Sequence, residues 1–351
     1  MKKTWIPLIV LVLLATAAAL YFATSRPGTP RSALGHSDAT LSDTGESVSI
    51  KPFPRGKERP LPPTDLPLSA VIDDLKRRAD RGEANAACRL ATEWTECLGL
   101  QKQLQRNETI LQNREHIALR LLPEGNSGNS QRKDISVDAI ERGVDYAVAE
   151  VERSKSALVH CEGVPSPQPE EVTRYWRQAA LAGHLPSMRN YAVGNAFRRD
   201  EILNNLPALM IYRQEAEKIA RQAADRGDLR AAIALAGAYS PLTARRGSFL
   251  SQIVEPNAAE SLVLSYRIHA AMEGIQDPLM RSARSELAGM INGLETMLSP
   301  QDARIAKDRA EKSRPLAAEA QDFRGLYTLE GGFVPDASKE ECDTATLRKD
   351  P

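Results

Sequence analysis

The chain has 351 residues, with 46 lysines and arginines against 46 aspartates and glutamates. This balance argues against a nucleic-acid-binding protein, since such proteins carry a surplus of basic side chains for the phosphates. Only 5% of the residues are aromatic. Helices that pack through small residues need few aromatics, so the composition favours an all-α fold over a β-sandwich.

Residues 1–24 have the pattern of a membrane segment. Lys2 and Lys3 precede an apolar run over residues 5–23, broken only by Pro7 and Thr16. A helix over this run, at about 1.5 Å per residue, would cover about 28 Å, close to the hydrocarbon thickness of a bilayer. We predict a single-pass signal anchor in the inner (cytoplasmic) membrane, with the bulk of the chain in the periplasm or otherwise exported. A cleavable signal peptide is the alternative, because small residues over 15–19 fit a cleavage site.

The rest of the chain divides into three parts by composition. Residues 25–67 are rich in Pro and Ser and poor in large apolar residues, so they predict a disordered linker. Helical periodicity runs over residues 68–327, and residues 328–351 are expected to form an extended C-terminal tail. A last helix is expected over residues 303–323, opened by a capping-box-like sequence from Ser299 to Asp302.

A short pattern, Ala-x-x-Gly, occurs four times in the helical part, starting at Ala79, Ala180, Ala224 and Ala271. Apolar residues precede the second copy at helical spacing, and the same positions are apolar 44 residues later. After another 47 residues only Arg267 departs from the pattern. Each glycine stands where a first helix must stop before a second begins, as a left-handed cap does. The pattern predicts an α/α solenoid of antiparallel helical hairpins.

These residues resemble the Sel1-like family of helical repeats, which are relatives of tetratricopeptide repeats. The family's first-helix aromatic, Ala-Ala pair, turn glycine and small residues in the second helix are matched over roughly residues 68–97 and 170–292. The matching residues are Trp176, Ala179, Ala180, Gly183 and Tyr191 in the second copy, Ala223, Ala224, Gly227 and Tyr239 in the third, and Ala270, Ala271 and Gly274 in the fourth. The resemblance implies a repeat array that binds other proteins.

Between the first two copies, residues at about 99–160 predict a long inserted helical hairpin. Its second arm has a coiled-coil-like seam interrupted only at Ser154, and its first arm repeats apolar residues at steps of seven from Leu104. A polar loop over residues 124–133 joins the arms. The insertion is the least family-like part of the chain, and is therefore a candidate place for a specific function.

Four cysteines would face an oxidising compartment if the chain is exported: Cys88, Cys97, Cys161 and Cys342. The two ends of the inserted hairpin return to the same side, which predicts a Cys97–Cys161 disulfide. Cys88 and Cys342 are left as a second pair or as free buried thiols. A Cys88–Cys97 pair is excluded, because nine residues of helix separate the two by about 13 Å.

No local motif for chemistry is present, so no catalytic residue, metal site or cofactor is predicted, and we expect no enzyme. His160 adjoins Cys161, but neighbouring side chains on a helix diverge by about 100° and would not meet. His184 and His269 lie in separate repeats without a second ligand at metal-binding spacing. His184 follows its turn glycine, which favours a role in the turn.

The first helices carry four arginines that face away from the alanine stripe: Arg174, Arg177, Arg213 and Arg221. In helical arrays such a face commonly holds the partner, and ordinary solvated charge is the alternative explanation. The sequence therefore predicts a membrane-anchored, periplasm-facing repeat protein that mediates protein–protein interactions. A cell-envelope hydrolase with a non-local active site and a structural assembly subunit are the alternatives.

Overall fold

The computed structural model describes residues 59–121, 137–242, 247–273, 275, 280–317 and 334–344. Two compact units are distinguished, Met1–Ser49 and Ile50–Pro351, and every described residue belongs to the second. The predicted membrane anchor and most of the predicted linker lie outside the described residues. Among the residues that can be described, no helix is both long and apolar enough to span a bilayer.

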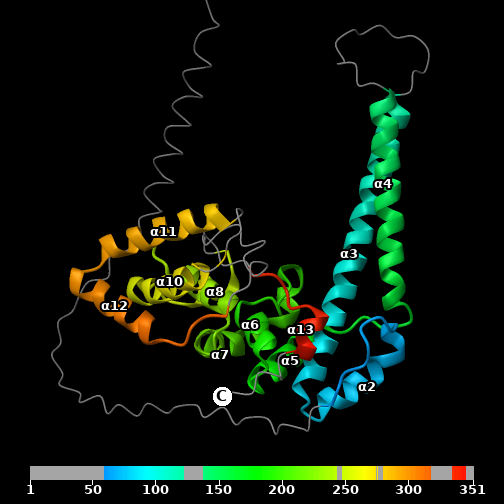
Figure 1. Ribbon diagram of the computed structural model, residues 1–351. Coiled ribbons are helices and arrows are strands. Elements are labelled where there is room, and N and C mark those ends of the chain that lie inside the picture. Colours follow the sequence, from blue (N-terminus) through cyan, green and yellow to red (C-terminus); the bar gives the residue numbers. More distant parts are fainter. Residues whose placement is uncertain are drawn as a thin grey trace, which may run out of the picture. The chain divides into compact units, whose positions relative to one another are not determined.

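The second unit is all-α, as predicted (Figure 1). Its helices are α2 Leu68–Asp80, α3 Ala84–Leu121, α4 Val137–Leu158, α5 Pro169–Leu181, α6 Leu185–Ala192, α7 Leu206–Asp225, α8 Leu229–Tyr239, α9 Phe249–Ile253, α10 Ala258–Met272, α11 Met280–Met297, α12 Pro300–Lys312 and α13 Lys339–Thr344. There are also two 3₁₀ helices: η1 Val159–Cys161 follows α4, and η2 Arg199–Asn205 precedes α7. Helices adjacent in the chain pack on each other from α5 to α8, and α8 then packs on α10.

Three of the four predicted glycine turns share one geometry. The φ angle is 90° at Gly82, 84° at Gly183 and 95° at Gly227, a left-handed conformation that glycine adopts without strain. At each turn the glycine amide and the next amide donate back to two carbonyls in the last turn of the first helix, as in a Schellman cap. The predicted cap is therefore confirmed at these three positions. Gly274 lies outside the described residues.

At two places a side-chain hydrogen bond also joins a first helix to the first helix that follows it. The carbonyl oxygen of Ala79, at the end of α2, accepts a hydrogen bond from Gln178 on α5. The corresponding oxygen of Ala224, at the end of α7, accepts a hydrogen bond of 2.8 Å from Arg267 on α10. Because each bond joins a first helix to the following first helix, it fixes the spacing between successive hairpins.

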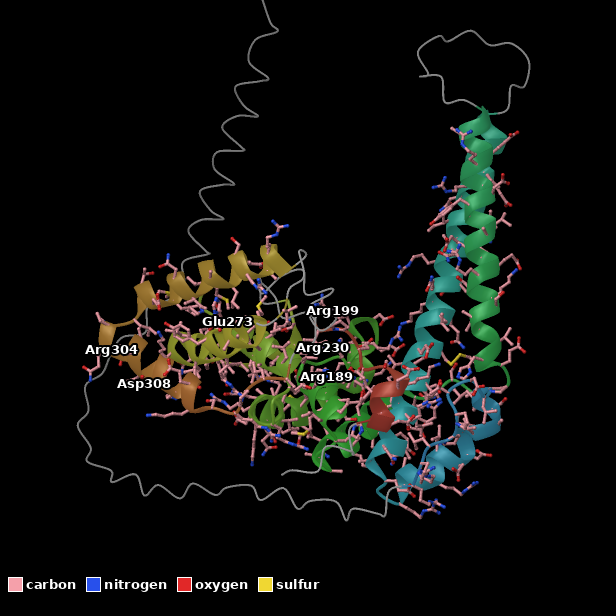
Figure 2. All side chains as sticks on the ribbon, in the orientation of Figure 1. Arg189, Arg199, Arg230, Glu273, Arg304 and Asp308 are labelled. Atoms are coloured by element: carbon pink, nitrogen blue, oxygen red, sulfur yellow. A yellow bond between two sulfur atoms is a disulfide. The ribbon has the colours of Figure 1, made fainter. Side chains whose placement is uncertain are left out.

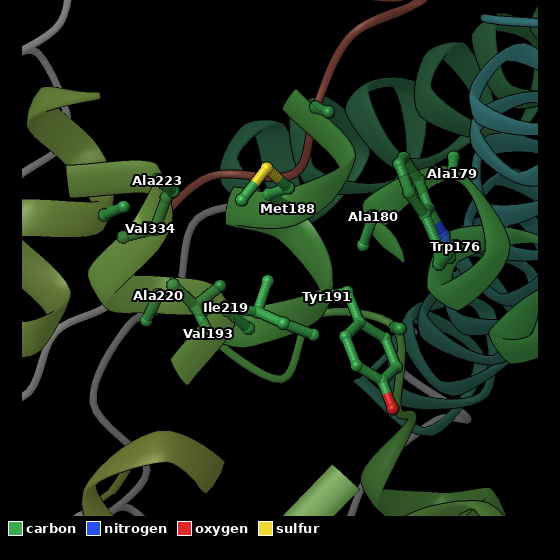
Figure 3. Close-up of a cluster of buried hydrophobic side chains, with 14 of the residues drawn as sticks. Trp176, Ala179, Ala180, Met188, Tyr191, Val193, Ile219, Ala220, Ala223 and Val334 are labelled. Atoms are coloured by element: carbon green, nitrogen blue, oxygen red, sulfur yellow. The ribbon is translucent and has the colours of Figure 1, made fainter. Parts of the chain in front are cut away.

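The core is the predicted alanine stripe with a few large side chains. Figure 3 shows Trp176, Tyr191 and Ile219 among the alanines of α5 and α7. Helix α8 is almost wholly buried, and only Arg230 is partly exposed. The stripe fails in the fourth copy, where Ala270 is exposed and Arg267 is buried. Burying an arginine requires partners for its guanidinium, and Arg267 has two backbone carbonyls and the Asp225 carboxylate.

The inserted hairpin is present, but its first boundary is wrong. Helix α3 runs for 38 residues without a break, so the second helix of the first repeat and the first arm are one element. Gly99, at the predicted start of the insertion, lies exposed within α3 with open space beside its Cα. A glycine in a helix interior costs only about 1 kcal/mol relative to alanine, which packing on either side offsets. The joining loop lies outside the described residues.

Helices α3 and α4 pack side by side (Figure 1). The seam between them contains a polar pair. Ala147 and Val151 are buried as predicted. Ser154, which interrupts the apolar pattern, is also buried and accepts a hydrogen bond of 3.0 Å from the Asn107 side chain. A polar pair inside an apolar seam fixes the register of the two helices.

Two expectations for the C-terminal part need correction. Helix α12 opens at the predicted Ser299 cap but ends at Lys312, well before residue 323. Pro315 accounts for this end, because a proline supplies no amide hydrogen and disfavours helical backbone in the residue before it. The tail is not extended throughout, since α13 forms a short helix over Lys339–Thr344 that packs on α3 and α6.

Candidate functional site

Three of the four arginines proposed for a partner face are engaged within the chain. Arg177 donates two hydrogen bonds, of 2.7 and 2.9 Å, to the Glu215 carboxylate on α7. The Tyr191 hydroxyl donates to the same carboxylate at 2.7 Å. Arg174 lies over the Tyr175 ring at 4.3 Å and 3.7 Å from Asp80. These pairs link neighbouring hairpins to one another.

Arg221 and Arg213 complete the predicted row. Arg221 stacks over the Tyr239 ring at 4.8 Å and pairs with both Glu217 and Glu260 at 3.2 Å. Arg213 is exposed on α7. Most arginines of the first-helix face therefore bind residues of the same chain and join successive hairpins. Fewer of them are available to a partner protein than the sequence predicted.

A cavity of about 320 Å³ opens where α7, α8, α10 and α12 meet. We call it the α7–α10 cleft. Its charged lining residues are Arg221, Asp225, Glu260, Arg267, Arg309 and Lys312, and its apolar lining residues include Ala224, Leu235, Val263 and Leu264. The cations outnumber the carboxylates by four to two, so the cleft carries a positive excess.

Glu260 is the central carboxylate of the cleft. It accepts a hydrogen bond of 2.8 Å from Arg309 on α12 and one of 3.2 Å from Arg221 on α7. The Arg309 hydrogen bond is the main cause that holds the pKa of Glu260 below its usual value. This arrangement shows that the cleft geometry places two guanidinium groups around one carboxylate.

Arg267 forms the inner wall of the cleft. Its side chain is 4% exposed and lies 3.5 Å from Asp225. Its Nη2 donates to the carbonyl oxygens of Ala224 and Arg314, and its Nε has no hydrogen-bond partner in the described part of the chain. Burial lowers the pKa of Arg267, because desolvation disfavours its charged form.

The second-helix face is covered by the C-terminal segment. The backbone amide of Ala337 donates to Asn190 Oδ1 at 3.1 Å, and Asn195 donates to the carbonyl of Val334 at 2.8 Å. Arg189 pairs with Asp228 at 3.1 Å and with Glu341 on α13 at 2.7 Å. Arg189 and Arg230 are both labelled in Figure 2, and Arg230 lies 3.6 Å from the same Glu341 carboxylate.

The four cysteines form two disulfides. The predicted Cys97–Cys161 pair joins α3 to the 3₁₀ turn after α4, at the foot of the inserted hairpin. Cys88 and Cys342, which the sequence left as a second pair or as free thiols, form the second disulfide and link α13 to α3. No cysteine is free, so Cys161 is not available as a nucleophile for His160.

Glu93 is a buried carboxylate near these disulfides, and it has several charged or titratable partners. Its carboxylate is fully buried and accepts from Arg89 Nε at 2.7 Å. Its other oxygen lies 2.8 Å from His160 Nε2 and 3.7 Å from Lys339 Nζ. Because these partners come from α3, η1 and α13, one carboxylate joins the repeat, the inserted hairpin and the tail.

His184 belongs to a turn, as the sequence predicted. It is the N-cap residue of α6, with Nδ1 2.9 Å from Ser187 Oγ and Nε2 3.2 Å from the Cys342 carbonyl. His269 is half-exposed, 3.5 Å from Glu273. Within the described ranges, no group of three or more His, Cys, Asp or Glu side chains is placed to hold a metal ion.

His184 predicts a loss of stability in mild acid. Burial is the main cause that lowers its pKa from 6.5 to about 4, so the folded chain holds it neutral. The unfolded chain takes up the proton below pH 6.5, so stability present above that pH is lost as the pH falls toward 4. We expect this residue to contribute a loss of about 2–3 kcal/mol between pH 7.5 and 4.5, measured by urea unfolding. The His184→Gln variant lacks this titration, and an equal pH-dependent loss in both proteins would contradict the assignment.

Comparisons with known proteins found no relative. No protein-family model matches the chain, and neither a curated protein nor a solved structure matches it significantly. The sequence missed Glu260, Arg309 and Lys312 as lining residues, although Arg267 signalled the place by breaking the apolar stripe.

Proposed function

We propose that this chain is a membrane-anchored, periplasm-facing α-solenoid of Sel1-like hairpins that binds other proteins. The observation that carries the proposal is the α7–α10 cleft, an open and charged cavity between two successive helical hairpins. Arrays of helical hairpins present such surfaces between neighbouring repeats. The three equivalent glycine turns and the repeated bonds to Ala79 and Ala224 support a stacked array.

The proposed location has two supports. Residues 1–24 carry the charge and hydropathy pattern of a signal anchor. Disulfides form and persist in oxidising compartments, and both pairs are formed here. A reporter that is active only after export, fused to the C-terminus, should be active, and activity of a cytoplasm-specific reporter instead would contradict the location.

Site-specific photocrosslinking in cells tests partner binding. A photoreactive amino acid at Ser313, which lines the cleft and leaves its charged side chains in place, should give a discrete adduct with another protein, identified by mass spectrometry. Asp73, exposed on α2 and away from the cleft, is the matched control position. If neither Ser313 nor the exposed Arg213 gives an adduct above the control, the proposed function is wrong.

A structural assembly subunit is the second candidate, and one observation favours it. The inserted hairpin presents exposed apolar side chains along its length, including Ile110 on α3 and Tyr146 on α4, the latter 64% exposed. Exposed aromatic side chains are enriched at protein interfaces. Adducts at Tyr146 that contain only further copies of this chain would favour self-assembly over a distinct partner.

A further inference from the structure

We propose that the α7–α10 cleft binds glutamate or aspartate side chains of an acidic segment in a partner protein. This inference rests on the proposed function and adds the chemistry of the partner. It begins from the charge of the cleft, where four cationic side chains meet two carboxylates. Such an excess in a concave site attracts an anionic group.

The cleft already binds one carboxylate of this chain. Glu260 lies between Arg221 at 3.2 Å and Arg309 at 2.8 Å, and both guanidinium groups donate hydrogen bonds to it. Charge-assisted bonds of this kind are the strongest that a planar guanidinium makes. The geometry therefore suits a second carboxylate that approaches the remaining positive charge.

Lys312 supplies that remaining charge. It is exposed at the C-terminal end of α12 and lines the cleft, and it forms no ion pair with any residue in the described ranges. Arg174 and Arg177, on the same row of first helices, face carboxylates of the neighbouring hairpin at Asp80 and Glu215. Among the cations that line the cleft, Lys312 is therefore the one without a carboxylate partner in the described part of the chain.

The apolar wall of the cleft favours a side chain over an inorganic anion. Leu235, Val263 and Leu264 line it beside the Tyr239 ring, which Arg221 covers at 4.8 Å. A carboxylate on a short aliphatic stem contacts both the cations and this wall. The volume of about 320 Å³ lies at the small end of ligand sites, which suits one or two side chains of a peptide.

Binding is measured with the full-length protein in detergent by fluorescence anisotropy. The probe is a short fluorescein-labelled peptide of alternating glutamate and leucine, and the matched probe replaces each glutamate by glutamine. We expect the acidic peptide to bind at least about tenfold more tightly, and to weaken as salt is raised because salt screens the charges. Equal binding of the two peptides would overturn the proposal. Free glutamate that competes at the same concentration as the peptide would also overturn it, in favour of a small organic acid.

Two variants of α12 locate the binding. Lys312→Glu removes the excess charge inside the cleft, whereas Lys307→Glu makes the same charge change on an exposed residue of α12 outside it. We expect a loss of about fivefold or more in affinity for Lys312→Glu, and less than about twofold for Lys307→Glu. Equal losses in the two variants would place the effect in net charge and overturn the proposal.

The proposal and the proposed function fail in different ways. If cells show a crosslinked partner whose capture is unchanged by Lys312→Glu, the chain binds proteins but not through this cleft. If the acidic peptide binds the cleft while no partner is captured at Ser313 or Arg213, the carboxylate site stands and the proposed function falls.

Discussion

Replacement of Glu93 by glutamine should lower the free energy of unfolding by about 3–5 kcal/mol, because it leaves a buried guanidinium without its counter-charge. Glu93 is fully buried, and its partner Arg89 is 1% exposed. Glutamine keeps the volume of glutamate, so the loss reports charge and hydrogen bonding rather than a cavity. Urea unfolding at neutral pH measures it.

The neighbouring Glu96→Gln variant is the matched control. Glu96 lies 3.0 Å from the same Lys339, but its side chain is 42% exposed. Solvent screens such a pair, so we expect a loss below about 1 kcal/mol. A double variant, Arg89→Met with Glu93→Leu, removes both buried charges and should be more stable than Glu93→Gln alone, since an apolar pair needs no solvation. A double variant as unstable as the single variant would show that the charge pair is not the source of the loss.

Local signals in the sequence were sufficient for much of the fold. A glycine that ends an alanine-rich stretch specifies its own turn, because few other residues adopt the left-handed conformation seen at Gly183 and Gly227. The Ser299 cap bonds to the amide of Asp302 in the same turn of chain. The Cys97–Cys161 pair followed from the antiparallel return of the inserted hairpin, which is a property of local periodicity.

The candidate site depends on contacts that local patterns do not record. Arg309 reaches Glu260 from 49 residues away, and Arg221 reaches it from 39 residues in the other direction. In its own sequence context, each of these residues has the pattern of an ordinary solvent-exposed charge on a helix. Only Arg267 carried a local signal, since it stands at a position that is apolar in the other well-matched copies.

The same limit applies to the tail. Its composition indicated an extended segment, and α13 is short enough that helix propensity alone would not maintain it. Its order comes from distant partners, including the Cys88 disulfide, the His184 contact to Cys342 and the Arg189 pair with Glu341. These partners lie in α3 and at α6, both far from the tail in the sequence, so no window of sequence contains them together with the tail.

Removal of the Cys88–Cys342 disulfide should have the largest effect on stability. The bond closes a loop across 254 residues, and the chain-entropy model sets its contribution at up to about 5 kcal/mol. For a unit of this size we expect the melting temperature of Cys88→Ala/Cys342→Ala to fall by up to about 8 °C under non-reducing conditions. The tail segment should also detach, which frees the Ala337 amide that now donates to Asn190.

Hydrogen exchange at Ala337 separates the two disulfides. Cys97→Ala/Cys161→Ala opens a loop across 64 residues, with an entropic loss of about 4 kcal/mol, but leaves the tail bound through Cys88. Its Ala337 amide should therefore stay protected, whereas the amide exchanges readily in the Cys88→Ala/Cys342→Ala variant. Protection that persists in the latter variant would show that the Asn190, Asn195 and Arg189 contacts hold the tail without a covalent bond. The disulfide would then stabilise the fold only by lowering the conformational entropy of the unfolded chain.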